Sequence, residues 1–311
     1  MTSSARHRRA ISLISVAIVC GGCVAQPGRP PFERTADGAG HASARPPKED
    51  ATPTATPDLV HVPAACYEMG STGGDLDERP PHEVCVSAFS IDRVEVSNAR
   101  YEECVVAGVC RAADRYPRRP ELSEPDRPVV GVSWIDADRF CHWAGERLPT
   151  DAEWELAAGG TDGRRYPWGD EPHSCELAVY AGCPPHRTVP VDSYPQGASP
   201  YGALHMAGNA WEWVWDWWSS GYYRRSPRQD PTGPEEGRMR SIRGGCWNRS
   251  HVHLRVEDRD SGVVGLRNDH VGFRCARSDG GQPRGRDFSG EKSLPRTPSP
   301  KDFRQVFPCA Q

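Results

Sequence analysis

The sequence predicts an α+β fold that is rich in loops and held together by disulfide bonds. Glycine and proline number 31 and 30 of the 311 residues, which disfavours a helical bundle or a coiled coil. Three segments carry helix signals, and short strand-like pieces lie between Pro- and Gly-bearing loops. Twelve cysteines indicate an oxidising compartment. With 37% hydrophobic residues and a net charge of −4, the composition excludes a polytopic membrane protein and predicts no nucleic-acid partner.

Residues 1–22 have the pattern of a secretory signal peptide. A basic segment, Arg6–Arg9, precedes an apolar run from Ala10 to Val19 that is too short to cross a bilayer. Gly21-Gly22-Cys23 at the end of this run is similar to the lipobox of bacterial lipoproteins, whose cysteine is acylated; an ordinary cleaved signal is the alternative. We expect Cys23 to carry lipid. The protein would then be exported and anchored through its lipid to a membrane of the bacterial cell envelope, facing the periplasm or the surface.

The predicted folded domain covers residues 59–278. Residues 23–58 and 279–311 are rich in Pro, small residues and charge, and they bury too little apolar surface to offset the entropy of ordering. We expect a disordered tether before the domain and a disordered tail after it. All ten tryptophans lie between Trp134 and Trp247, which marks the densest part of the predicted core.

Three helices can be placed from their start signals. Residues 133–136 and 150–153 each have the hydroxyl-x-x-acid form of a capping box. Apolar residues then recur at helical spacing, and Gly145 and the glycine pair 159–160 can end these two helices. A third helix is predicted to begin at Ser97. The strand-like pieces are Val84–Ile91, Arg243–Trp247 and Val271–Ala276.

Six motifs occur in a fixed order in this region. They are Val132–Ala137 (VSWIDA), Cys141–Glu155 (CHWAGERLPTDAEWE), Tyr166–Gly169 (YPWG), Gly208–Trp213 (GNAWEW), Arg243–Trp247 (RGGCW) and Gly272–Ala276 (GFRCA). Together they resemble the formylglycine-generating enzyme family, also called sulfatase-modifying factors, from about His61 to Arg277. The resemblance implies one compact domain related to the C-type lectin fold, with calcium as a structural ion. It also implies an oxidase that uses oxygen and copper to convert a sulfatase cysteine to formylglycine.

The resemblance places the two copper-binding cysteines of the family in the segment after Gly244-Gly245. These positions correspond to Arg249 and Leu254, and no cysteine lies between Cys246 and Cys275. Two thiolates suit copper(I), whereas arginine and leucine side chains supply no ligand. We therefore expect neither bound copper nor catalytic residues. The domain would act as a binding or scaffolding module for an unknown envelope protein or peptide.

Two alternatives keep an altered oxidase open. Cys246 stands where the family usually has serine and could be a lone reactive thiol. A second alignment places one cysteine position near His251. If this segment is a strand, His251 and His253 point the same way and could offer two imidazoles to a metal, although such a pair is more often a surface pair.

Ten cysteines remain once Cys20 is assigned to the signal and Cys23 to the lipid. The resemblance implies a disulfide between Cys141 and Cys275. Closeness in sequence suggests three more pairs, Cys104–Cys110, Cys175–Cys183 and Cys66–Cys85. The two cysteines that remain, Cys246 and Cys309, would form the fifth pair.

The resemblance also assigns calcium to Gly208, Ala210 and Glu212, through two backbone carbonyls and one carboxylate. His205 stands where a side-chain oxygen ligand is expected, and an imidazole is a poor ligand for this cation. The alternative is that Glu212 accepts backbone hydrogen bonds without a metal. Every second residue from 211 to 217 is tryptophan, so one face of an extended segment is expected to be aromatic and mostly core.

Overall fold

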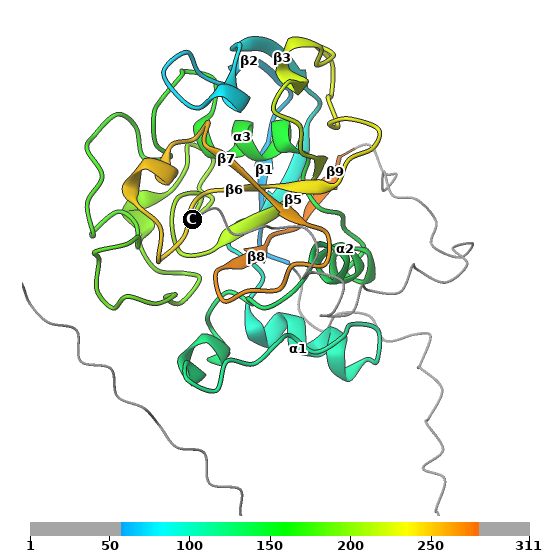
Figure 1. Ribbon diagram of the computed structural model, residues 1–311, viewed down its shortest axis with the longest axis vertical. Helices are drawn as coiled ribbons and strands as arrows, with labels where there is room; N and C mark the ends of the chain where they lie inside the picture. Colours follow the sequence, from blue (N-terminus) through cyan, green and yellow to red (C-terminus); the bar gives the residue numbers. More distant parts are fainter. Residues whose placement is uncertain (1–56, 280–311) are drawn as a thin grey trace, which may run out of the picture. The chain divides into compact units, whose positions relative to one another are not determined.

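The structure is a computed structural model that describes residues 57–279 (Figure 1). The predicted signal peptide, Cys23 and nearly all of the predicted tether and tail lie outside the described residues. The described strands are β1 (Leu59–Val62), β2 (Ala65–Met69), β3 (His82–Val86), β4 (Phe89–Asp92), β5 (Trp211–Trp217), β6 (Met239–Arg243), β7 (Arg259–Val263), β8 (Val271–Phe273) and β9 (Ala276–Ser278). The helices are α1 (Asn98–Val106), α2 (Trp134–Trp143) and α3 (Asp151–Gly159), with short 3₁₀ helices η1 (Leu76–Glu78), η2 (Pro120–Ser123), η3 (Pro195–Gly197), η4 (Tyr222–Arg224) and η5 (His251–Leu254).

The described strands form three small sheets, with long irregular segments between them (Figure 1). The largest has the order β7-β6-β5-β8, and β5 pairs antiparallel with β6 but parallel with β8. A second sheet has the order β1-β4-β9, so the first and last strands share one neighbour. Strands β2 and β3 form the third. The predicted α+β, loop-rich architecture is confirmed.

The three predicted helices are present and begin where their caps predict. Ser133 and Thr150 each accept a hydrogen bond from the third backbone N–H of their helix, while Asp136 and Glu153 complete the two capping boxes. The Ser97 hydroxyl caps α1 by accepting from the Arg100 N–H. These local signals succeed because each cap satisfies donors that the first turn of a helix leaves free.

The predicted strands needed correction at three places. Residues 84–91 belong to two strands, β3 and β4, and residues 271–276 likewise belong to β8 and β9. The strand predicted over 243–247 is instead the end of β6, which stops at Arg243. Gly244 and Gly245 have φ of 94° and 71°, a left-handed backbone that turns the chain out of the sheet.

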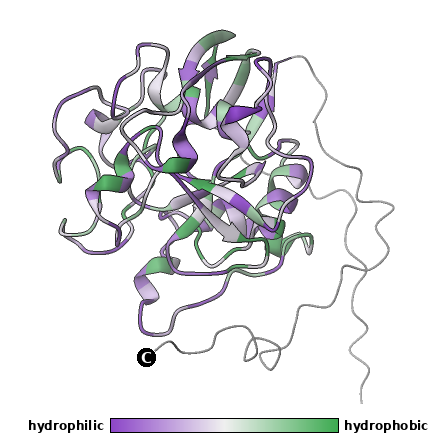
Figure 2. Ribbon diagram, turned by 45° about the horizontal axis from the view of Figure 1, so that its top comes forward, coloured by the Kyte–Doolittle hydropathy of each residue, from purple (hydrophilic) through white to green (hydrophobic). Residues whose placement is uncertain are grey.

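The core contains aromatic side chains from helices and strands. Phe140 on α2 stacks near Tyr101 on α1, with ring centroids 5.5 Å apart, and packs edge-on against Phe273 on β8 at 5.4 Å. Trp211 and Trp213 are fully buried, as predicted, but Trp215 and Trp217 on the same strand are partly exposed. Figure 2 shows hydrophilic residues along much of the outer loops and hydrophobic ones within the strands and helices.

Four of the predicted disulfides are confirmed. They join Cys66 to Cys85, Cys104 to Cys110, Cys141 to Cys275, and Cys175 to Cys183. Cys246 carries a free thiol in the described part of the chain, and its predicted pairing stays a prediction. Cys309, the partner in that assignment, lies outside the described residues.

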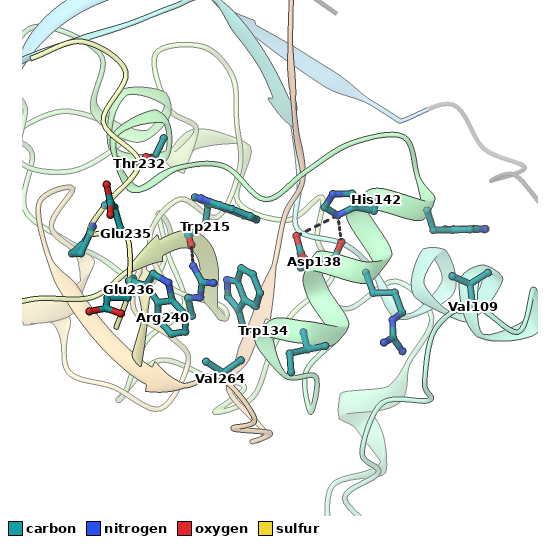
Figure 3. A pocket seen from close by; sticks show the side chains of 16 residues that line it. Val109, Trp134, Asp138, His142, Trp215, Thr232, Glu235, Glu236, Arg240 and Val264 are labelled. Carbon is teal, nitrogen blue, oxygen red and sulfur yellow. Dashed lines mark hydrogen bonds and ion pairs between the residues drawn. The ribbon is translucent and has the colours of Figure 1, made fainter. Parts of the chain in front are cut away.

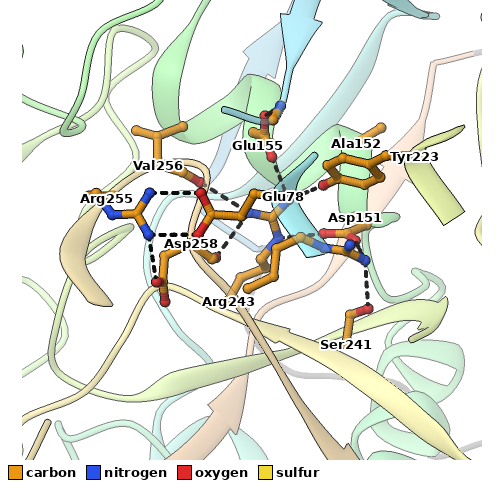
Figure 4. A network of polar contacts seen from close by, with 12 residues as sticks. Glu78, Asp151, Ala152, Glu155, Tyr223, Ser241, Arg243, Arg255, Val256 and Asp258 are labelled. Atoms are coloured by element: carbon orange, nitrogen blue, oxygen red, sulfur yellow. Dashed lines mark hydrogen bonds and ion pairs between the residues drawn. The ribbon is translucent and has the colours of Figure 1, made fainter. Parts of the chain in front are cut away.

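A buried network of ion pairs joins α3 to strands β6 and β7 of the largest sheet (Figure 4). Asp151 at the start of α3 accepts hydrogen bonds from Arg243 and, at 2.6 Å, from Arg259. One turn later, Glu155 lies 2.5 Å from the Arg243 guanidinium. Burial opposes ionisation of Asp151, but Arg243 and Arg259 outweigh it and hold the pKa of this carboxyl below its ordinary value. Two acids and two arginines therefore neutralise one another inside the protein.

Candidate functional site

The segment to which the resemblance assigns copper is a tight loop that follows β6. A Cβ on Gly245 would lie 2.5 Å from the backbone oxygen of His253, so the two ends of the loop approach more closely than any side chain would permit. The GNAWEW turn lies beside this loop. The Gly208 N–H donates to the Gly244 carbonyl at 2.7 Å, and the Trp247 N–H donates to the Asn209 carbonyl at 3.0 Å. The predicted copper and calcium regions are thus neighbours.

Neither predicted copper position offers a ligand. Leu254 is completely buried and packs with Tyr166, Ala178 and Ala207. The Arg249 side chain is exposed, and its backbone carbonyl accepts a hydrogen bond from the Ala181 N–H at 2.8 Å. One position therefore fills the core and the other holds two loops together. A copper ion does not fit these residues.

Cys246 does not replace the missing thiolates. Its side chain is buried, and the thiol donates to the Asn248 side-chain oxygen at 3.1 Å. Burial raises the pKa of the Cys246 thiol to about 12, which keeps it protonated at neutral pH. Within residues 57–279, no cluster of three His, Cys, Asp or Glu side chains close enough to share a metal includes Cys246. The thiol is a buried apolar group with one weak hydrogen bond.

The turn assigned to calcium is stabilised by protein groups. Arg274 donates to both oxygens of the Glu212 carboxylate, at 2.6 and 2.7 Å, and the Trp154 indole N–H adds a third bond at 2.8 Å. Burial and the positive charge of the nearby Arg274 lower the pKa of His205 to about 3, so its imidazole is neutral. Calcium takes six to eight oxygen ligands, and this set supplies two carbonyls and one neutralised carboxylate. The three predicted residues by themselves do not fit a calcium ion.

A second carboxylate stabilises the same turn and was missed by the sequence analysis. Glu95 is completely buried, and it accepts hydrogen bonds from the Asn209 side chain at 2.7 Å and from the Ala210 N–H at 3.1 Å. Burial and the nearby Glu212 raise the pKa of Glu95 well above its ordinary value. Glu95 lies more than a hundred residues before this turn and belongs to no recognisable motif, so no local signal could have identified it.

Similarity to known proteins identifies the family of this domain. A family model described as "Sulfatase-modifying factor enzyme 1-like domain" matches residues 43–279. The chain belongs to the formylglycine-generating enzyme family. It is 36% identical to the formylglycine-generating enzyme of Streptomyces coelicolor, over 76% of this chain and 94% of that enzyme.

Other similar proteins carry different names. Serine/threonine-protein kinase pkn1 of Chlamydia caviae is 37% identical over 71% of this chain, which spans only 38% of that kinase. Among solved structures, PvdO from Pseudomonas aeruginosa has a TM-score of 0.63 and 27% identity over 71% of this chain and 94% of its own. Membership of the formylglycine-generating enzyme family and its fold are thus shown by sequence and by structure.

The strand on which a metal-binding pair of His251 and His253 depended is not present at residues 251–254. They lie on the 3₁₀ helix η5 instead of a strand, so they do not share a face by alternation. The His253 ring lies 3.1 Å from an Asp258 oxygen, and this carboxylate raises the pKa of the imidazole. His251 stacks on His173, with ring centroids 4.1 Å apart. His173, whose Nδ1 lies 2.9 Å from the Tyr180 hydroxyl, was not predicted from the sequence.

Calcium binding at the GNAWEW turn stays a prediction of the family resemblance, and the geometry described above does not favour it. We therefore expect chelation to leave the melting temperature of the protein unchanged. Thermal unfolding with EDTA and with added calcium provides the measurement. A ligand that binds only the folded state stabilises it by about 2.7 kcal/mol at a hundredfold excess over its dissociation constant. A lower melting temperature in EDTA that disappears in Glu212→Gln would reinstate calcium at this turn.

Proposed function

We propose that this chain is an exported, lipid-anchored member of the formylglycine-generating enzyme family that lacks formylglycine oxidase activity and acts as a binding module in the cell envelope. The observation that carries the proposal is the loop after β6, with an exposed Arg249, a buried Leu254 and a protonated, buried Cys246. Copper(I) chemistry on a substrate cysteine needs soft ligands that can lose a proton, and these groups offer none.

Family membership by itself argues for the enzyme activity, because a relative that matches most of this chain is named a formylglycine-generating enzyme. A shared fold does not establish a shared reaction, which depends on particular side chains at the site. The loop after β6 is where this chain departs from its family. That departure supports a binding role over an oxidase.

We expect the purified protein to leave a Cys-x-Pro-x-Arg peptide unoxidised in the presence of copper and oxygen. Mass spectrometry of the peptide would detect any aldehyde, with the Streptomyces coelicolor enzyme as the positive control. The physical reason is the absence of a thiolate pair to hold copper(I) beside the substrate thiol. Oxidation by the wild-type chain that is lost in Cys246→Ser would contradict the proposal and make this protein an oxidase with a relocated thiol.

The predicted lipid anchor rests on Cys23 following Gly21-Gly22 at the end of the apolar run. Within residues 57–279, no helix is long and apolar enough to cross a membrane. Acylation supplies about 0.8 kcal/mol of membrane affinity for each buried CH₂ group. We expect Cys23→Ser to move the protein from the membrane fraction to the soluble fraction, as measured by fractionation and immunoblotting. Cys20→Ser is the matched control and should remain with membranes. Retention of Cys23→Ser in the membrane fraction would refute the anchor.

A further inference from the structure

A cavity of about 1450 Å³ lies away from the loop after β6, and no residue from 246 to 254 lines it. Its walls come from α2, the end of β5, Arg240 on β6 and the loop 232–236, with Val109 and Val264 at the edges of the set (Figure 3). Sites for one small ligand commonly occupy about 300–1,000 Å³, so this cavity suits a larger ligand. Nothing in the family resemblance assigned a role to it.

Tryptophan side chains form one wall of the cavity, and a buried arginine fixes them. The Arg240 guanidinium lies 3.7 Å from the ring centroid of Trp134 and 3.6 Å from that of Trp217. It also donates to the backbone carbonyl of Trp215. Cation–π contacts of this kind hold the rings in place before any ligand arrives. The partly exposed rings of Trp215 and Trp217 therefore present a rigid aromatic surface.

Side chains of both charge signs surround this aromatic surface. Glu235 and Glu236 are exposed on one side, and Asp138 and His142 lie on the other, with Trp134 between them (Figure 3). Arg139 on α2 also lines the cavity and is exposed. The two glutamates would repel an anionic ligand, and Arg139 and Arg240 would repel a cationic ligand. A wholly apolar ligand would remove these charges from water without giving them hydrogen bonds.

We propose that this cavity binds a neutral oligosaccharide. Sugar rings have an apolar C–H face that packs on indole rings, and their hydroxyls both donate to carboxylates and accept from guanidinium groups. Several linked sugar rings fit a cavity that is larger than a site for one small ligand. This inference supplies a ligand class for the binding role proposed above. It concerns a different part of the protein from the loop after β6, so either proposal can fail without the other.

Titration calorimetry of the whole exported chain with chitotetraose and with maltotetraose tests the inference. We expect saturable binding of at least one of them, and weaker binding of the cationic glucosamine tetramer and the anionic tetragalacturonate. Trp217→Ala should weaken the binding about tenfold, because it removes one of the partly exposed rings on which a sugar would pack. Trp168→Ala is the matched control, since Trp168 is a partly exposed tryptophan outside the cavity that stacks on Tyr166 at 5.0 Å.

A second variant keeps the test decisive if Trp217→Ala fails to fold. Glu235→Ala combined with Glu236→Ala changes only exposed loop side chains and should weaken binding about fivefold through lost hydrogen bonds. Three results would overturn the inference: no saturable binding of either neutral tetrasaccharide, unchanged affinity in the folded cavity variants, or tighter binding of a charged tetramer than of both neutral ones.

Discussion

Replacement of Arg243 by methionine is expected to lower the free energy of unfolding by about 3–5 kcal/mol, as is usual when one partner of a buried ion pair is removed. The Arg243 side chain has no exposed surface, and it bonds Asp151, Glu155 and the backbone carbonyls of Val256 and Asp258. Without it, Asp151 keeps its hydrogen bond from Arg259, whereas Glu155 keeps, among residues 57–279, only the hydrogen bond from the Gly70 N–H at 2.8 Å. A buried carboxylate would then lack a cation.

Urea unfolding followed by tryptophan fluorescence measures this loss. Arg228→Met is the matched control, because Arg228 forms the same type of pair with Glu83 but both side chains are about 60% exposed. Solvent screens such a pair, so the control is expected to unfold like the wild type. Equal midpoints for Arg243→Met and the wild type would show that the buried network does not stabilise the fold.

Removal of the Cys141–Cys275 disulfide should be comparably damaging. This bridge joins α2 to the segment between β8 and β9, across a sequence separation of 134 residues. Cross-linking restricts the unfolded chain more when the closed loop is longer, which predicts a loss of about 5 kcal/mol for Cys141→Ala with Cys275→Ala. Typical domains are stable by about 5–15 kcal/mol, so this loss approaches the whole stability of a weak domain.

The Cys104–Cys110 bridge provides the comparison, since its separation is only 6 residues and both cysteines are buried. The same loop-entropy relation predicts a loss of about 2 kcal/mol for Cys104→Ala with Cys110→Ala. Urea unfolding of both double variants tests the difference. If the short bridge proved as important as the long one, unfolded-chain entropy would not explain the stabilisation by these disulfides.

Features governed by neighbouring residues were predictable from the sequence. The capping boxes at Ser133 and Thr150 need only four residues each, and both formed as predicted. The short-range disulfides followed from spacing, whereas Cys141–Cys275 followed only from the family resemblance. The expectation that copper does not bind also rests on residue type, because arginine and leucine side chains supply no ligand, and it stays a prediction.

Features that depend on distant residues were not predictable. Alternation correctly placed Trp211 and Trp213 in the core, but it could not show that Trp215 and Trp217 leave the core where the register of β5 against β6 shifts. Pairing of Glu212 with Arg274 and of Asn209 with Glu95 joins residues 62 and 114 positions apart. The cavity arises from five separate stretches of the chain, around residues 109, 134–143, 215–217, 232–240 and 264, and no motif marks it.

The position of β4 between β1 and β9 has a mechanical consequence. Both neighbours run antiparallel to β4, so they run in the same direction as each other. Leu59 begins β1 opposite Asp92, and Ser278 ends β9 opposite Phe89, at the other end of β4. A force that pulls Leu59 and Ser278 apart would slide β1 and β9 along β4 in opposite directions. Because interstrand hydrogen bonds lie across the strands, such a pull loads all the bonds of each ladder together instead of opening them one by one.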